Sequence, residues 1–275
     1  MKVLTLNTHS WIEDDPEEKL EQLAKKISEE DYDVIALQEV NQLKKAAPAI
    51  VDDFYCPVTD YVILEDNFAL RLSERLQVLG AEYYWTWEFS HTGYGIYQEG
   101  LALLSKNPIL PSSHLVSKVD DVEDVRRRII LTGVTEVDRK MICACSGHYS
   151  WWSAGGSEEG FKVEWEHTEQ FLADVDYPLL VMGDFNNPEG TQGYQLVVNS
   201  ELGIQDTFVT SEDQTGSFTV AKSIDGWSEN KGLLRIDYVF ASPELKAAHY
   251  QVMFDGISGP VVSDHFGVAV QFEEE

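Results

Sequence analysis

Short apolar runs with strand periodicity recur along the whole chain, and single polar or charged residues interrupt or follow them. The clearest runs at the two ends of the chain are residues 2–7, 31–40, 233–242, 246–255 and 265–272. A helical pattern over residues 15–30, with Asp15 as N-cap and Pro16 at the first helical position, separates the first two. A strand–helix–strand unit of this kind favours an α/β fold with the helix packed on a sheet.

The middle of the chain contains more strands and a few helices. Two helical patterns are predicted between residues 41 and 80, one at 158–175 and a short one at 194–200. Residues 82–100 predict a strand and a long loop, and further strands are predicted at 101–105, 127–137, 140–150 and 179–182. No linker or repeat divides the chain, so a single domain over residues 1–275 is expected, with two packed sheets and helices outside.

The composition limits the partners. With 20 Lys and Arg against 48 Asp and Glu, the formal net charge is −28, which disfavours nucleic-acid backbones and anionic membranes. Cys143 and Cys145 lie two apart on a predicted strand, and the odd total of three cysteines predicts reduced core thiols. The first residues lack the pattern of a signal peptide, and no apolar run is long enough for a membrane span, which predicts a cytoplasmic protein.

Polar side chains cluster at the ends of the predicted strands. They are Asn7, Glu39, His148, Asp184, Asn186, Asp237, Asp264 and His265. An unpaired charge in an apolar context is costly, so one such residue usually marks a satisfied hydrogen bond. Interruptions in six different segments are better explained by one shared site.

The chemistry of these residues suits a metal-assisted reaction. Carboxylate and amide oxygens of Glu39, Asp184, Asp264, Asn7 and Asn186 are ligands of the kind that Mg²⁺ or Mn²⁺ prefers. His265 offers a base beside Asp264, and His148 offers a donor for a charged oxygen. Together they predict attack of water on phosphorus.

The ordered motifs "LNTH", "LQEV", "EGLALLS", "GHYS", "GDFNNP", "RIDYVFAS" and "SDH" cover essentially the whole chain. This set resembles the endonuclease/exonuclease/phosphatase superfamily, which includes deoxyribonuclease I, sphingomyelinases and sugar phosphatases. The resemblance implies a four-layer α/β sandwich, with two packed mixed β-sheets flanked by helices. It also implies hydrolysis of phosphate esters with a divalent metal.

The resemblance assigns a role to each matching position. Glu39, Asn7 and Asp264 match the metal-binding residues, and Asp184 and Asn186 match the pair that positions water and phosphate. Asp237 matches the carboxylate that orients the catalytic His265, and His148 matches the residue that stabilises the pentavalent phosphate. One departure is that many relatives have Asn-Thr-His-Leu where this chain has Ser146-Gly147-His148-Tyr149.

Three substrate classes compete: a small phosphorylated sugar, a nucleic acid, and a phospholipid cleaved by a secreted diesterase. A non-catalytic binding module is a fourth alternative, which the intact set of metal and histidine residues opposes. The charge and the N-terminus favour the sugar, and the chain resembles cytoplasmic sugar-phosphate phosphatases, maltose 6'-phosphate phosphatase among them. The predicted substrate-binding residues are Tyr149, Trp151, Trp152, Arg126 and Glu99. We expect a small phosphorylated metabolite as partner, and neither nucleic acid nor membrane.

Overall fold

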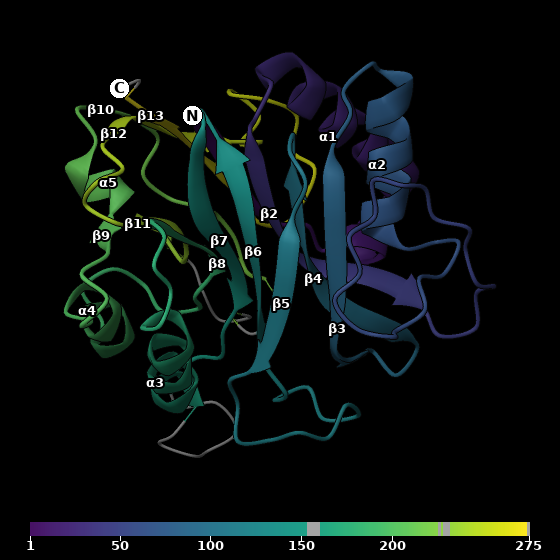
Figure 1. The fold of residues 1–275 in the computed structure, drawn as a ribbon, viewed down its shortest axis with the longest axis horizontal. Helices are drawn as coiled ribbons and strands as arrows, with labels where there is room; N and C mark the ends of the chain where they lie inside the picture. The colour runs from purple at the N-terminus through teal and green to yellow at the C-terminus, as the bar shows by residue number, and fades with distance from the viewer. Residues whose placement is uncertain (153–159, 225–226, 228–231, 274–275) are drawn as a thin grey trace.

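The computed structural model describes residues 1–152, 160–224, 227 and 232–273. These residues form two mixed β-sheets that pack face to face, with helices on both outer faces (Figure 1). The predicted four-layer sandwich is therefore confirmed.

The first sheet contains both ends of the chain. In spatial order its strands are β10 (Asp213–Thr215), β12 (Ala247–Met253), β13 (Gly267–Phe272), β1 (Lys2–Asn7), β2 (Val34–Leu43), β4 (Tyr97–Ser105) and β3 (Tyr84–Gly93). The second sheet has the order β5 (Leu110–Leu115), β6 (Ile129–Val137), β7 (Lys140–His148), β8 (Leu179–Asp184), β11 (Asp237–Ala241) and β9 (Gln205–Asp206). Neighbours β1 and β2 run parallel, as do β7 and β8, so within each pair the carboxyl ends of the two strands lie at the same edge of their sheet.

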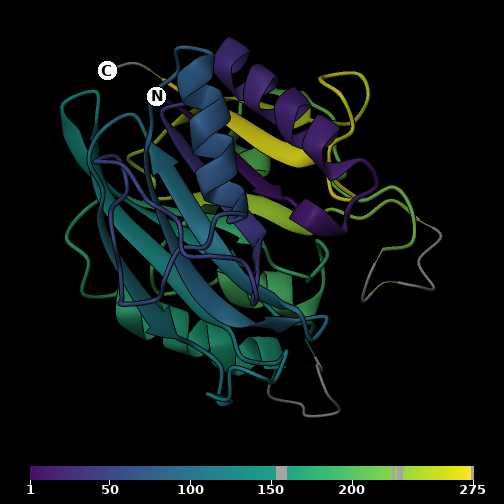
Figure 2. The ribbon, with the colours of Figure 1, turned by 90° about the vertical axis from the view of Figure 1, so that its right-hand side faces the viewer.

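Helices cover the outer faces. On the first sheet, α1 (Pro16–Glu30) and α2 (Phe68–Val78) lie side by side, as Figure 2 shows. On the second sheet lie α3 (Gly160–Leu172) and α4 (Gln192–Val198), while the short η1 (Ser10–Ile12) and α5 (Thr207–Thr210) sit in connections. None of the described helices is long and apolar enough to cross a membrane.

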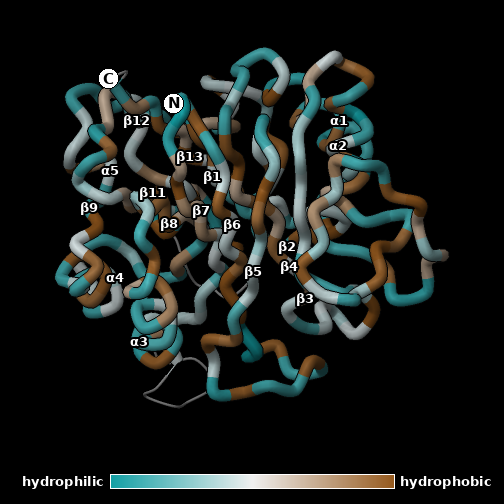
Figure 3. The backbone as a smooth tube through the Cα atoms, in the orientation of Figure 1, coloured by the Kyte–Doolittle hydropathy of each residue, from teal (hydrophilic) through white to brown (hydrophobic). Residues whose placement is uncertain are grey.

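Strand alternation produces three apolar interfaces. Within β1, Val3 packs between the sheets, whereas Leu4 packs against the helices α1 and α2. Within β8, Leu180 again faces the other sheet, and Val181 faces the cluster around α3. Figure 3 shows hydrophobic residues concentrated along the strands between the helical layers.

The same alternation continues to the strand ends. Asn7 follows the phase of Val3 in β1, and Asp184 follows the phase of Leu180 in β8, so both lie on the faces between the sheets. The apolar interior of the sandwich is thus replaced at one end by polar side chains. The candidate site lies there.

Several local predictions need correction. Only one of the two helices expected between residues 41 and 80 forms, because residues 44–67 run through turns and isolated bridges that include Pro48 and Pro57. Residues 82–100 are predicted to form a strand followed by a long loop. They instead form β3, a short connection and the start of β4, which pair as a hairpin. Asp15 is the N-cap residue of α1, but its side chain makes no capping hydrogen bond. Cys143 and Cys145 are free and buried, as predicted.

Candidate active site

Three residues from three strands meet at the end of the sandwich. The amide Nδ2 of Asn7 donates to Oε1 of Glu39 at 2.8 Å and to Oδ2 of Asp184 at 3.1 Å. Asn7 and Asp184 are almost fully buried. One amide therefore bridges two carboxylates that belong to different sheets.

Glu39 reaches this position through an irregularity in its strand. The pairing of β2 with β4 shifts register between Leu37 and Val40, and Glu39 has a left-handed φ of 52°. A bulge of this kind re-aims one side chain without ending the sheet. A non-glycine residue in this conformation costs about 1–3 kcal/mol and is concentrated at functional sites.

Asn186 is held by its own backbone and by two neighbours. Its N–H donates to Oδ1 of Asp184 at 2.8 Å, and its φ is 49°. Its side-chain Nδ2 donates to the carbonyl of Tyr149 at 3.0 Å, and its Oδ1 accepts from the indole Nε1 of Trp227 at 2.9 Å. The amide has a fixed orientation, and Trp227 is a contributor that the sequence analysis missed. Phe185, between Asp184 and Asn186, turns into the core.

One imidazole and two carboxylates lie in register on three neighbouring strands of the second sheet. His148 of β7 lies opposite Asp184 of β8, which in turn lies opposite Asp237 of β11. One step earlier, Gly147 pairs with Gly183, where a Cβ on Gly183 would stand 1.9 Å from the carbonyl oxygen of Gly147. Only glycine at residue 183 permits this close approach of β7 and β8.

His265 is paired with Asp237. Its Nδ1 lies 3.1 and 3.0 Å from the two carboxylate oxygens of Asp237, and its Nε2 lies 3.7 Å from Oδ2 of Asp184. Burial disfavours the imidazolium, but the carboxylates of Asp237 and Asp184 outweigh burial and raise the pKa of His265 to about 10. In this state the ring is a cation among carboxylates and can donate a proton from Nε2.

His148 has the opposite protonation behaviour. Burial, followed by the nearby positive charge of Arg128, lowers the pKa of His148 well below its ordinary value. Its Nε2 lies 3.6 Å from Oδ2 of Asp184 and 4.0 Å from Oε1 of Glu39. The ring is therefore neutral, with one N–H to offer to a ligand.

These groups open into a cleft of about 520 Å³. The lining residues that carry polar chemistry or aromatic rings are Glu39, His91, Tyr94, Glu99, Arg126, Arg128, His148, Ser150, Trp151, Asp184, Asn186 and His265. The cleft thus joins the buried acid and imidazole cluster to two arginines and an indole.

The two arginines differ sharply. Arg126 is exposed and is paired with Asp124, with Nη2 to Oδ2 at 2.6 Å and Nε to Oδ1 at 2.9 Å. Arg128 is only 7% exposed, forms no ion pair with a described residue within 4 Å, and its Nε has no hydrogen-bond partner. Arg126, one of the predicted substrate-binding residues, lies exposed at the cleft and is paired, whereas Arg128 forms no ion pair with a described residue.

The predicted aromatic contacts also separate. Tyr149 follows His148 in the chain, faces the opposite side of the sheet, and is fully buried among Phe161, Trp165 and Phe185. Its assignment to substrate binding is wrong, because adjacent positions at a strand end point in opposite directions.

Trp151 and Trp152 have different surroundings. Trp152 packs against the same apolar cluster as Tyr149 and is not among the described lining residues of the cleft, which corrects its assignment. Trp151 lines the cleft, and its Nε1 has no hydrogen-bond partner.

Glu99 lines the cleft as well. It is 6% exposed, and its Oε1 lies 3.3 Å from Nε2 of His91. Burial, followed by the charge of Glu39, raises the pKa of Glu99, so this carboxyl holds its proton more readily than an exposed one.

Asp264 stands at the other side of the cluster. Its backbone N–H donates to Oε1 of Glu13 at 2.9 Å, and its Oδ1 lies 3.8 Å from Nδ1 of His9. Burial raises the pKa of Glu39, and the negative charge of the nearby Asp264 carboxylate raises it further. His9 and Glu13 were given no role by the sequence analysis.

The donor set fits a hard divalent cation. Glu39 and Asp184 share the amide of Asn7, and Asp264 lies close enough for its charge to act on Glu39, although it lines a neighbouring hollow with His9 and Glu13. No described lysine or arginine forms an ion pair with Glu39 or Asp184. His265 is one positive charge among these carboxylates, and the remaining buried negative charge is unfavourable unless a metal or a proton neutralises it. Their ligand roles remain predictions. Asn7 is the further predicted ligand, but its Nδ2 faces the carboxylates of Glu39 and Asp184 and its Oδ1 accepts the N–H of His9.

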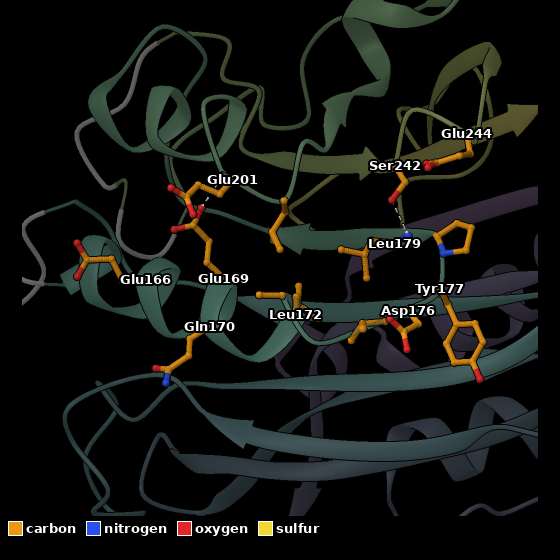
Figure 4. Close-up of a pocket in the computed structure, with 14 residues that line it drawn as sticks. Glu166, Glu169, Gln170, Leu172, Asp176, Tyr177, Leu179, Glu201, Ser242 and Glu244 are labelled. Carbon is orange, nitrogen blue, oxygen red and sulfur yellow. Dashed lines mark hydrogen bonds between the residues drawn. The ribbon is translucent and has the colours of Figure 1, made fainter.

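A larger hollow of about 620 Å³ lies elsewhere, beside α3 (Figure 4). Its acidic lining residues are Glu166, Glu169, Asp176, Glu201 and Glu244, and none of its described lining residues is Lys, Arg or His. Glu169 is already used structurally, because its Oε1 accepts from the Ser200 hydroxyl and from the Glu201 N–H. An anionic ester would be repelled there, so the chemistry belongs to the other cleft.

The fold and the cluster of carboxylates and histidines place the chain in a class of proteins whose members hydrolyse phosphate esters. A family model described as "Endonuclease/Exonuclease/phosphatase family" matches residues 10–265. The chain belongs to this family, whose members depend on divalent metals. Among curated proteins, no significant sequence match to the chain was found.

Solved structures agree with this assignment. An endonuclease/exonuclease/phosphatase family protein from Leptotrichia buccalis C-1013-b is 33% identical, covers 100% of both chains and has a TM-score of 0.86. The mannosyl-6-phosphatase of Bacteroides thetaiotaomicron VPI-5482 is 16% identical over 100% of both chains, with a TM-score of 0.67. The beta toxin of Staphylococcus aureus with bound magnesium ions is 14% identical over 99% of both chains, with a TM-score of 0.69. The last two likenesses show the fold.

Proposed function

We propose that the protein is a Mg²⁺- or Mn²⁺-dependent phosphomonoesterase for a small phosphorylated sugar, such as the disaccharide phosphate maltose 6'-phosphate. The observation that carries the proposal is the composition of the cleft. It joins the cluster of Glu39, Asp184 and His265 to the unpaired cation of Arg128 and to the indole of Trp151. A phosphate and an uncharged ring are the two parts that such a cleft would recognise.

In this proposal Arg128 and His148 bind the phosphate. A guanidinium presents a planar fork of donors that matches two phosphoryl oxygens, and Nε of Arg128 has no hydrogen-bond partner among the described residues. The neutral ring of His148 donates a further hydrogen bond. Nδ2 of Asn186 donates to Tyr149, and its second N–H is the remaining donor of an oriented amide.

The reaction itself would be carried out by a bound metal ion and by the carboxylate and imidazole groups of the cleft. A bound divalent cation would polarise the phosphoryl group and lower the pKa of water. Asp184 is placed to orient the attacking water, and His265, held by Asp237, is placed to manage the proton. The chain thereby supplies orientation and a fixed charge pattern, which are the main protein contributions to phosphoryl transfer.

The alternatives from the same family are a nuclease and a sphingomyelinase-like diesterase. The net charge of −28 opposes binding of a long phosphate polymer. Of the two arginines at the cleft, one is already neutralised by Asp124. A small monoester requires only one local cation, so the phosphatase is favoured.

The test of the sugar is a comparison of substrates and of two neighbouring tryptophans. We expect Trp151→Ala to lower kcat/KM for maltose 6'-phosphate by about tenfold, near the upper end of what one aromatic contact contributes. Trp152→Ala should leave it within about twofold, because Trp152 packs on the apolar cluster around α3. Hydrolysis rates on maltose 6'-phosphate, p-nitrophenyl phosphate and duplex DNA, measured with Mg²⁺, give the readout.

A generic aryl phosphate should be nearly insensitive to both tryptophan variants. Faster cleavage of DNA than of any sugar phosphate would contradict the proposal. So would an equal loss with Trp151→Ala on sugar and aryl phosphates.

A second prediction separates the two arginines. Arg128→Met should raise KM for every phosphomonoester and the inhibition constant of inorganic phosphate by about 10- to 100-fold, the usual contribution of a hydrogen-bonded charge. Arg126→Met removes the same charge from a position that is exposed and paired, so both constants should change by less than about threefold. Steady-state kinetics of each variant, with and without inorganic phosphate, give both KM and the inhibition constant. Equal effects of the two variants would show that Arg128 is not the phosphate anchor.

A further inference from the structure

The segment that follows β1 makes an unusual reversal. His9 and Ser10 both have left-handed φ angles, 48° and 35°, before the short helix η1 begins. Thr8 ties the segment to the strand that carries Glu39, because its hydroxyl lies 2.9 Å from the carbonyl of Gln38. The reversal brings Glu13 back into contact with His9, two residues after the end of β1. Backbone strain of this kind persists only where surrounding contacts hold it.

Glu13 is the centre of a small network there. Its Oε1 lies 2.7 Å from Nδ1 of His9 and accepts the N–H of Asp264 at 2.9 Å. Its Oε2 is paired with Lys19 of α1. The side chain of Glu13 is only 10% exposed, and the contact to Asp264 joins residues 251 positions apart. One carboxylate therefore links the first loop of the chain to the last.

The network also fixes Asn7. The backbone N–H of His9 donates to Oδ1 of Asn7 at 3.2 Å, which turns Nδ2 of the same amide toward Glu39 and Asp184. The Ser263 hydroxyl donates to the carbonyl of Asn7 at 2.7 Å. Asn7 and Asp264, two of the three predicted metal-binding residues, are thus held by the same two loops.

We propose that Glu13 is a positioning residue of the metal centre, which sets the Asp264 carboxylate and the Asn7 amide for a divalent cation without binding the cation itself. His9, Glu13 and Asp264 offer ligand atoms within 4.8 Å of one another. However, both oxygens of Glu13 are already engaged by His9, Asp264 and Lys19. Outer contacts that orient ligands typically alter metal affinity or activity by about 10- to 100-fold when removed.

The proposal rests on the metal-dependent part of the proposed function and is independent of the sugar. It is tested by titrating the full chain with Mn²⁺, with the concentration of free Mn²⁺ measured by electron paramagnetic resonance. Turnover of p-nitrophenyl phosphate at saturating Mn²⁺ and thermal unfolding in chelator are measured alongside. Glu13→Ala should weaken Mn²⁺ binding at least about tenfold and lower kcat by a similar factor.

Two further variants show whether the hydrogen bond is responsible. Glu13→Gln retains Oε1 as acceptor for Asp264 and should stay within about threefold of the original chain in Mn²⁺ affinity. Glu17→Gln removes the same charge from an exposed position of α1 and should leave all three measurements unchanged. If Glu13→Ala does not fold, Glu13→Asp replaces it, because one methylene less withdraws the acceptor from Asp264.

Three results would overturn the proposal. The first is a lower unfolding temperature for Glu13→Ala with Mn²⁺ affinity and kcat unchanged, which would show a purely structural role. The second is an equal loss in Glu13→Gln and Glu13→Ala, which would assign the effect to charge. The third is absence of Mn²⁺ binding by the original chain, which would remove the metal centre, whereas failure to cleave sugar phosphates alone would leave the proposal intact.

Discussion

Replacing His265 with Ala is expected to lower turnover by at least about a hundredfold, the lower end of the contribution of general acid–base catalysis. The ring is 4% exposed, is held by both oxygens of Asp237, and presents Nε2 at 3.7 Å from Asp184. It therefore faces the position where water and phosphate would react. Because the ring acts on the reacting atoms, kcat should fall while KM changes little.

Asp237 acts through His265, and its replacement tests that link. Asp237→Asn preserves the shape of the side chain but removes the charge that stabilises the imidazolium, so kcat should fall without loss of phosphate binding. A matched control is His249→Ala, since His249 lies on β12, is paired with Asp213 of β10 and is partly exposed. Single-turnover rates with an aryl phosphate would measure all three. A His265→Ala protein that retains most of its turnover would assign the proton transfer to another residue.

The apolar pattern explains why so much of the fold could be predicted. Strands such as β1 and β8 have one face against helices and one against the opposite sheet, so they are continuous apolar runs that end at a polar residue. A polar residue at the end of such a run is informative, because burying a carboxylate without a partner is energetically costly. Asn7, Asp184, Asp237 and His148 were identified in this way, and the structure brings them together.

The errors arose where side-chain direction departs from simple alternation or was not applied. Tyr149 directly follows His148 in a strand, so alternation itself should have assigned it to the opposite face. Glu39 could not be oriented from the sequence, because a bulge and a left-handed backbone decide its direction. Among the arginines, only tertiary packing distinguishes Arg126, which is paired, from Arg128, which is not.

The contacts that no local pattern could reveal are those between loops. Trp227 reaches Asn186 across 41 residues, and Glu13 reaches Asp264 across 251. Neither residue interrupts an apolar run, which was the signal that identified the other site residues. Their roles depend on how two irregular segments lie against each other, and irregular segments carry no periodic signal.

Removal of divalent metal is expected to abolish turnover, and Glu39→Gln should reproduce this loss at metal concentrations that saturate the original chain. Glu39 meets Asp184 through a single bridging amide, and the charge of Asp264 acts on it, so a neutral side chain there removes one carboxylate of this acidic group. The same change should not destabilise the metal-free protein. Burial raises the pKa of Glu39, and a neutral amide avoids the cost of a carboxylate among carboxylates.

Thermal unfolding with and without Mg²⁺ distinguishes these two effects. A cation at about 100 times its dissociation constant stabilises the folded state by about 2.7 kcal/mol, which for a chain of this size is about 5 °C. The original chain should show this rise, and Glu39→Gln should lose it while unfolding in chelator at the same or a higher temperature. Glu99→Gln makes the same chemical change in the same cleft and should retain the rise, because Glu99 is paired with His91 and does not share the Asn7 amide that joins Glu39 to Asp184. An undiminished Mg²⁺ shift in Glu39→Gln, or full activity of the original chain in chelator, would place the metal elsewhere or remove it from the mechanism.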